Sequence, residues 1–77
     1  MKAAKLFVDG SEYCDFCYDS NSINANIKYR LDNMCFFGYE HLDEFEWHAE
    51  NERGEVIIRG MATVNFTPSV TVKVDDD

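Results

Sequence analysis

Apolar and polar residues alternate along several segments of this chain, and this period of two limits what it can fold into. The longest uninterrupted run is Ser22–Leu31, where Ile, Ala, Tyr or Leu occupies every second position. Successive side chains of a β-strand point to opposite faces, so such a segment buries one face and exposes the other. We therefore predict a strand over residues 22–31, because a helix would scatter these apolar residues around its whole circumference.

Shorter alternating runs, separated by turn residues, predict further strands. The expected strands cover residues 5–8, 11–18, 22–31, 34–37, 56–66 and 70–74. Asp9-Gly10 is a strong two-residue hairpin signal, and Asn51–Gly54 has the length and the glycine of a second hairpin loop. Gly60 interrupts the run over residues 56–66 and is expected to mark a bulge or a bend. One parity of that run is apolar, with Val56, Ile58, Ala62, Val64 and Phe66 on the same side.

An acidic stretch lies between residues 40 and 55, with Arg53 as the single cation inside it. Its carboxylates are Glu40, Asp43, Glu44, Glu46, Glu50, Glu52 and Glu55. If residues 44–50 form a strand, its polar side chains form a ladder that faces water at a spacing of ~6.6 Å, which is two strand rises. That ladder consists of Glu44, Glu46, His48 and Glu50, whereas Phe45, Trp47 and Ala49 would face inward. Trp47 then fills the core, although an exposed Trp47 would be an interface anchor.

The segment Glu40–Asn51 also fits a second interpretation. Leu42, Phe45 and Ala49 have helical spacing, and Gly54 could follow the C-terminus of a short helix. Together the patterns predict an all-β fold, or a β-rich fold with one short helix near residues 40–51. We expect a small antiparallel sheet of five to six strands, curled into a sandwich or a barrel.

Size and charge restrict the class of function. The chain has 77 residues, of which 45% are hydrophobic, and we expect a single folded domain with residues 75–77 as an acidic tail. Fifteen acidic residues against seven basic ones give a net charge of −8. This charge opposes direct binding to nucleic acid, which needs Lys and Arg at phosphates, and binding to anionic membranes. A basic protein or nucleoprotein is the remaining electrostatic partner, although acidity can also serve solubility alone.

The cysteines allow a metal-binding alternative. Cys14 and Cys17 form a Cys-x-x-Cys pair, and Cys35 and His41 follow downstream, so that three thiolates and one imidazole could bind zinc. If residues 11–18 form a strand, however, Cys14 and Cys17 point to opposite faces, and packing of Cys14 in the core is the simpler interpretation. An odd number of cysteines, no signal peptide and no apolar run of ~20 residues indicate a reducing, cytoplasmic setting.

No nucleophile–base pair is visible, and we expect neither enzymatic activity nor a cofactor. The sequence instead predicts a small acidic module that inhibits or regulates a basic, nucleic-acid-binding partner. In size and composition alone it is similar to the inhibitors that bacteriophages direct against restriction and CRISPR systems. The predicted contacts are the seven carboxylates of residues 40–55. Alternatives are a zinc-stabilised binding module and a subunit, such as a homodimer, that assembles through strand edges.

Overall fold

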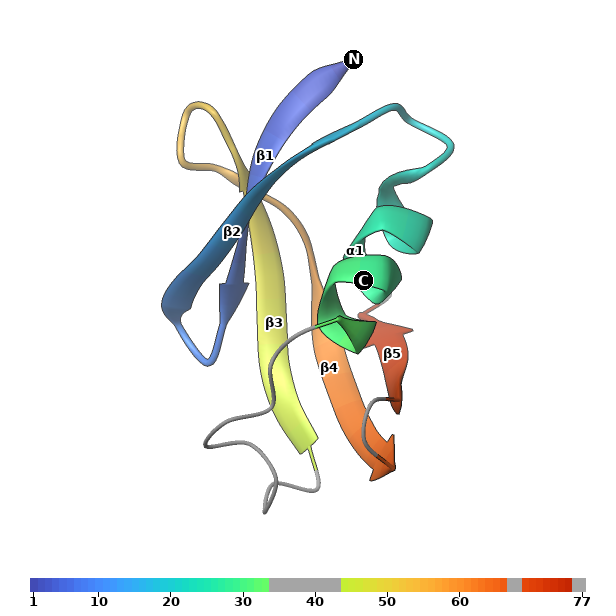
Figure 1. Ribbon diagram of the computed structural model, residues 1–77. Helices are drawn as coiled ribbons and strands as arrows, with labels where there is room; N and C mark the ends of the chain where they lie inside the picture. Colours follow the sequence, from blue (N-terminus) through green and yellow to red (C-terminus); the bar gives the residue numbers. More distant parts are fainter. Residues whose placement is uncertain (34–43, 67–68, 76–77) are drawn as a thin grey trace.

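The computed structural model describes residues 1–33, 44–66 and 69–75 of the chain. Its elements are β1 (Lys2–Val8), β2 (Ser11–Tyr18), α1 (Ile23–Asp32), β3 (Glu44–Asn51), β4 (Val56–Phe66) and β5 (Ser69–Val74). The strands form one sheet in the order β2-β1-β3-β4-β5, and all neighbours are antiparallel (Figure 1). The predicted β-rich antiparallel fold is therefore confirmed. The expected strand at residues 34–37 lies outside the described residues.

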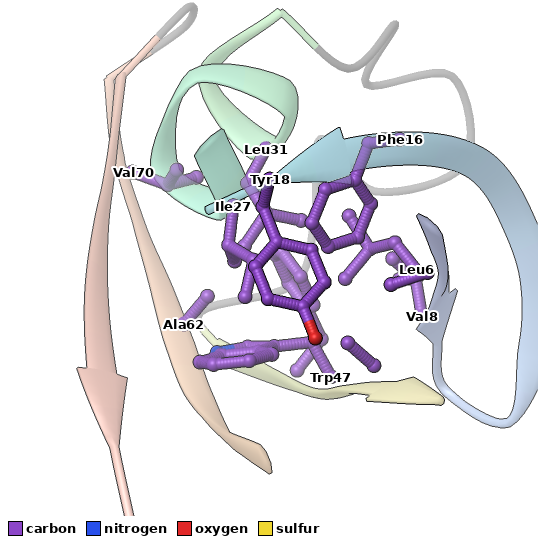
Figure 2. Close-up of a cluster of buried hydrophobic side chains, with 12 residues drawn as sticks. Leu6, Val8, Phe16, Tyr18, Ile27, Leu31, Trp47, Ala62 and Val70 are labelled. Carbon is purple, nitrogen blue, oxygen red and sulfur yellow. The ribbon is translucent and has the colours of Figure 1, made fainter. Parts of the chain in front are cut away.

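The sheet does not close into a barrel, because its two outer strands, β2 and β5, do not pair with each other. Helix α1 lies against one face of the sheet and contacts both β2 and β5. Figure 2 shows Ile27 and Leu31 of this helix pointing into a core that includes Trp47 and Ala62 of the sheet. Ile27 and Leu31 are fully buried there. One helix thus closes the apolar face that a second sheet would cover in a sandwich.

The helical conformation of residues 23–32 corrects the strand that we predicted from the alternation over Ser22–Leu31. The apolar residues of this run also include the helical series Ile23, Ile27 and Leu31, which recurs every four residues and faces the sheet. Tyr29 belongs to the same alternation, yet its side chain is 64% exposed on the helix surface. The sequence fits both the period of two of a strand and the spacing of a helix. The helix forms because its apolar side chains can pack against the sheet.

Residues 44–51 form a strand, so the alternative of a short helix near residues 40–51 is wrong for the described part of that segment. Residues 40–43 lie outside the described structure. Trp47 is 2% exposed, and its Nε1–H group donates a hydrogen bond of 3.0 Å to the main-chain oxygen of Met61. The indole is therefore core filler with a satisfied donor, not an exposed interface anchor.

The two predicted hairpins are confirmed. Asp9 and Gly10 join β1 to β2 with φ angles of 52° and 81°, the left-handed conformation that a tight two-residue hairpin requires. Gly54, with a φ of 80°, lies in the turn between β3 and β4. In that turn the Asn51 side-chain oxygen accepts hydrogen bonds from the main-chain N–H groups of Arg53 and Glu55.

Strand β4 differs from the prediction in two respects. Gly60 does not mark a bulge, because it pairs in regular register with Trp47 and Val74. It is required for close packing instead, since a side chain there would collide with the Lys73 carbonyl oxygen and lie 2.8 Å from the Trp47 ring. The pairing of β4 is irregular instead at Ile57, since Ala49 pairs with Ile58 and Glu50 pairs with Val56, and again between Val64 and Phe66, which pair with the adjacent residues Val70 and Ser69. The bulge at Ile57 reverses the parity of the strand, so Val56 does not share a face with Ile58 and Ala62 as the alternation predicted, and it is 52% exposed.

No helix in the described ranges 1–33, 44–66 and 69–75 is long and apolar enough to cross a membrane.

Replacing the side chains of α1 distinguishes the helix from the strand that the alternation suggested. Leu31→Ala should lower the free energy of unfolding by about 2–5 kcal/mol, because it removes most of a fully buried side chain and leaves a cavity in the core. Tyr29→Ala should cost less than about 1 kcal/mol, because Tyr29 lies on the exposed face. Urea unfolding followed by Trp47 fluorescence measures both values. Comparable losses for the two variants would contradict the helical register.

Asp32 at the end of α1 makes stability depend on pH. The Lys28 ammonium, through a hydrogen bond of 2.8 Å, and the main-chain N–H of Val70 lower the pKa of this carboxyl group below its usual value. A carboxylate with a lowered pKa stabilises the fold above its ordinary pKa of about 3.9, and the contribution is lost as the pH falls through the folded value.

Asp32→Asn, which keeps the size and one acceptor oxygen, should therefore lower the unfolding free energy at pH 7 by about 0.5–1 kcal/mol. The difference between the variant and the wild type should shrink below about pH 4. Urea unfolding at a series of pH values tests this expectation. A difference that stays constant from pH 7 to pH 3 would show that the charge of Asp32 does not contribute.

Candidate functional site

The face of the sheet that points away from α1, here called the open face, carries polar side chains from all five strands, among them Lys5, Asp15, Glu46, Arg59 and Lys73. No described element covers it. On β3 the alternation directs Glu44, Glu46, His48 and Glu50 to the open face, and Phe45, Trp47 and Ala49 to the core. The predicted ladder of residues 44–50 therefore exists as a row along the central strand.

The ladder has an aromatic centre. Phe7 of β1 lies directly opposite His48, and the two rings are stacked with centroids 4.6 Å apart and an angle of 4° between their planes. His48 Nε2 also lies 2.8 Å from a carboxylate oxygen of Glu50. This stack and the short contact restrict the rotamers of three neighbouring side chains. The middle of the open face is thus held in one arrangement.

Cations lie between the carboxylates of the open face. Lys5 of β1 is opposite Glu50, and its ammonium lies 2.7 Å from a carboxylate oxygen of Glu12 on β2. The hydrogen bond to Glu12, together with the charges of Glu12, Asp15 and Glu50, raises the pKa of Lys5. Arg59 of β4 is the cross-strand neighbour of His48. Basic residues that separate the carboxylates reduce the repulsion that a purely acidic row would suffer.

The strand order brings together acidic groups that are distant in the sequence. Glu12 and Asp15 belong to β2, and β1 places them beside Glu50 of β3. Between these strands the surface forms an open hollow of about 560 Å³. Its lining includes Ala3, Lys5, Phe7, Glu12, Asp15, Cys17, Glu50 and Glu52. We call it the β1–β2 hollow. A second hollow, of about 410 Å³, lies along β3 and β4 and is lined in part by Glu46, His48, Arg59, Met61 and Asp75.

Sequence reasoning did not identify Glu12 and Asp15 as members of the site. The signal available was the alternation of Ser11–Tyr18, which directs Asp15 outward, but the sequence did not indicate that β1 lies between β2 and β3. A bulge at Tyr13 adds to the difficulty. Because Leu6 pairs with Cys14 and Phe7 pairs with Glu12, Tyr13 is the extra residue. This bulge allows Glu12 to reach Lys5 on the open face.

The other predicted contact residues are divided. Glu52 is exposed in the β3–β4 turn and lines the β1–β2 hollow. Glu55 is exposed in the same turn, where its carboxylate accepts a hydrogen bond of 3.1 Å from the Asn51 amide. Glu40 and Asp43 lie outside the described residues. The structure therefore brings Glu44, Glu46, Glu50 and Glu52 to one side of the sheet with Glu12 and Asp15.

The zinc alternative is weakened by the geometry of β2. Cys14 is half-buried and packs against the core, whereas Cys17 is exposed on the open face. The two thiols therefore point to opposite sides of the strand, as the alternation predicted, and do not converge on one ion. Among the described residues, no group of three side chains could hold a metal. Cys35 and His41, the other proposed ligands, lie outside the described ranges.

Comparison with protein-family models, with curated proteins and with solved structures found no match.

The two described thiols should differ in reactivity. Burial raises the pKa of the Cys14 thiol, and the core restricts access to it, whereas Cys17 faces solvent. In a Cys35→Ser background at pH 7.5, Cys17 should react with iodoacetamide at least about tenfold faster than Cys14, because the thiolate is the reacting form. Peptide mass spectrometry over time measures both rates, and unfolding in urea should make them similar. Equal rates in the folded protein, or protection of both thiols by added zinc, would contradict this placement.

Proposed function

We propose that this chain is a small acidic interaction module that binds a basic protein through the open face of its sheet and thereby inhibits or regulates it. The observation that carries the proposal is the row Glu44, Glu46 and Glu50 on a single strand, with the stacked pair Phe7 and His48 at its centre. A fixed row of carboxylates fits a surface rich in Lys and Arg.

Charge and rigidity support this proposal together. The net charge of −8 attracts a basic partner over a distance and speeds its encounter, while a fixed array determines which basic surface fits. Glu44 and Glu46 are exposed, and Glu50 is half-buried at the edge of the β1–β2 hollow. Because β3 is the central strand, its backbone is held by β1 and β4 on both sides. The backbone at these positions is therefore already ordered, and binding has to order only the side chains.

In its most specific form, the proposal is that the module mimics nucleic acid. A basic surface that normally contacts phosphates, such as that of a defence nuclease or a CRISPR complex, would also attract a row of carboxylates. We place the protein in a reducing compartment such as the cytoplasm, because three cysteines do not suit the disulfide framework of a small secreted domain.

A pair of variants with equal net charge tests the proposal. The partner is first captured from a lysate of the source organism on the immobilised wild-type chain. Glu44→Gln/Glu46→Gln should then weaken binding of that partner by on the order of tenfold or more, mainly through slower association. The control Asn24→Lys/Ala25→Lys changes the net charge equally, but on the exposed surface of α1, and it should change the affinity less than about twofold.

Surface plasmon resonance at several salt concentrations gives the rates and the affinities. Wild-type binding should weaken steeply with salt, because exposed charges are screened beyond ~8 Å at physiological ionic strength. Equal losses for the two variants, or tight binding that is unchanged in ~1 M salt, would contradict the proposal. The mimicry form alone fails if the partner binds its nucleic acid and this chain at the same time.

A further inference from the structure

The two edges of the sheet differ in how their main-chain groups are used. At β5, the N–H of Val70 donates to Asp32 Oδ1 at 3.1 Å, and the Val70 carbonyl oxygen accepts from Lys28 Nζ at 3.2 Å. Lys28 and Asp32 are themselves joined by a salt bridge of 2.8 Å. Side chains of α1 thus occupy the positions that the backbone of a neighbouring strand would take at Val70.

At β2, by contrast, main-chain groups point out of the sheet. The N–H of Asp9, just after β1, donates to the main-chain oxygen of Glu46 in β3, and the main-chain groups of successive residues in an antiparallel strand point to alternate sides. On β1, the main-chain groups that point toward β2 are therefore those of Leu6, Ala4 and Lys2. These residues pair with Cys14, Phe16 and Tyr18. It follows that the main-chain groups of Asp15 and Cys17 face outward, and none of the described hydrogen bonds engages them.

The side chains along the β2 edge select the kind of strand that could pair there. Glu12 and Asp15 are acidic and lie on the open face, next to the β1–β2 hollow. A second copy of this chain would bring its own carboxylates against them, and like charges on neighbouring strands destabilise pairing. The part of the β5 edge that follows Val70 also faces outward. The side chains there on the open face are Thr71 and Lys73, and they do not attract a basic strand.

The hollow beside β2 could hold a long basic side chain. Ala3, Phe7 and Cys17 supply apolar lining, and Glu12, Asp15, Glu50 and Glu52 surround it with carboxylates, of which Glu12 is bound to Lys5. A Lys or Arg side chain can pack its aliphatic stem against apolar surface while its charged end contacts carboxylates. An added strand places every second side chain on the open face, where it can enter this hollow.

The core side of the β2 edge has a different requirement. The Arg30 guanidinium of α1 lies over the Phe16 ring, 5.5 Å from its centroid. Phe16 and Tyr18 are already buried, so there is no empty core for large residues of an added strand to fill. The positive charge of Arg30 also disfavours basic residues on this side. An added strand should therefore alternate basic residues with small or polar ones.

We propose that β2 pairs with an extended basic segment of the partner, which becomes a sixth strand and directs alternate Lys or Arg side chains into the β1–β2 hollow. This inference rests on the proposed function, since the same basic partner provides the segment. The bulge at Tyr13 limits pairing to the part of β2 that follows it. Main-chain hydrogen bonds at Asp15 and Cys17 hold the added strand on β2. The carboxylates of the β1–β2 hollow select basic side chains in that strand.

A synthetic peptide with four lysines alternating with three serines and blocked ends serves as the probe. Amide hydrogen exchange of the full chain, measured by NMR at saturating peptide, should slow at least tenfold at Asp15 and Cys17. The matched control is the same peptide with N-methyl groups on alternate residues, which keeps the charge but removes the donors of one strand edge. It should bind at least tenfold more weakly.

Three results would overturn the pairing. The bound peptide could shift the NMR signals of Glu46 and Met61 without protecting the amides of Asp15 and Cys17. This result would show contact with the open face alone and would leave the proposed function intact. Failure of the peptide to bind at millimolar concentration, while the captured partner still binds, would also exclude it. Protection of the Asp15 and Cys17 amides in the chain alone, increasing with its concentration, would identify a second copy as the strand that pairs with β2. The proposed function fails separately, if the Glu44→Gln/Glu46→Gln variant binds the partner as the wild type does.

Discussion

Helix α1 buries a single face of the sheet, and this determines where the core and the exposed charges lie. Ile27 and Leu31 of α1 are fully buried against the sheet, and Trp47 lies beneath them in the core (Figure 2). A chain this short can form only one apolar core, since small domains bury a limited share of their surface. That core is on one side of the sheet, which leaves the opposite side free to carry charge.

The same arrangement explains how a row of carboxylates can be held in place. Each strand contributes alternate residues to the core, and these fix the positions of the residues between them on the open face. On β3, the buried side chains of Phe45, Trp47 and Ala49 determine where Glu44, Glu46 and Glu50 lie. Repulsion within the row is offset locally by cations such as Lys5. Core packing and surface charge are therefore two consequences of a single alternation.

The sequence predicted those parts of the fold that are encoded locally, and missed those that depend on tertiary contacts. The Asp9-Gly10 hairpin and the ladder on β3 follow from turn chemistry and from period two. Helix α1 was missed because Ser22–Leu31 fits both periods, and only the uncovered sheet distinguishes them. Glu12 and Asp15 were missed as members of the site because strand order is not a local property. The bulge at Ile57 likewise carries no clear sequence signal.

Carboxyl footprinting of the complex with its captured partner shows whether the open face is the binding surface. Carbodiimide-coupled labelling followed by mass spectrometry reports the accessibility of each acidic side chain with and without the partner. Binding through the open face should protect Glu44, Glu46 and Glu50, while Asp19, in the turn before α1, is labelled as in the free chain. Protection of Asp19 with unchanged labelling of the three glutamates would contradict binding through the open face.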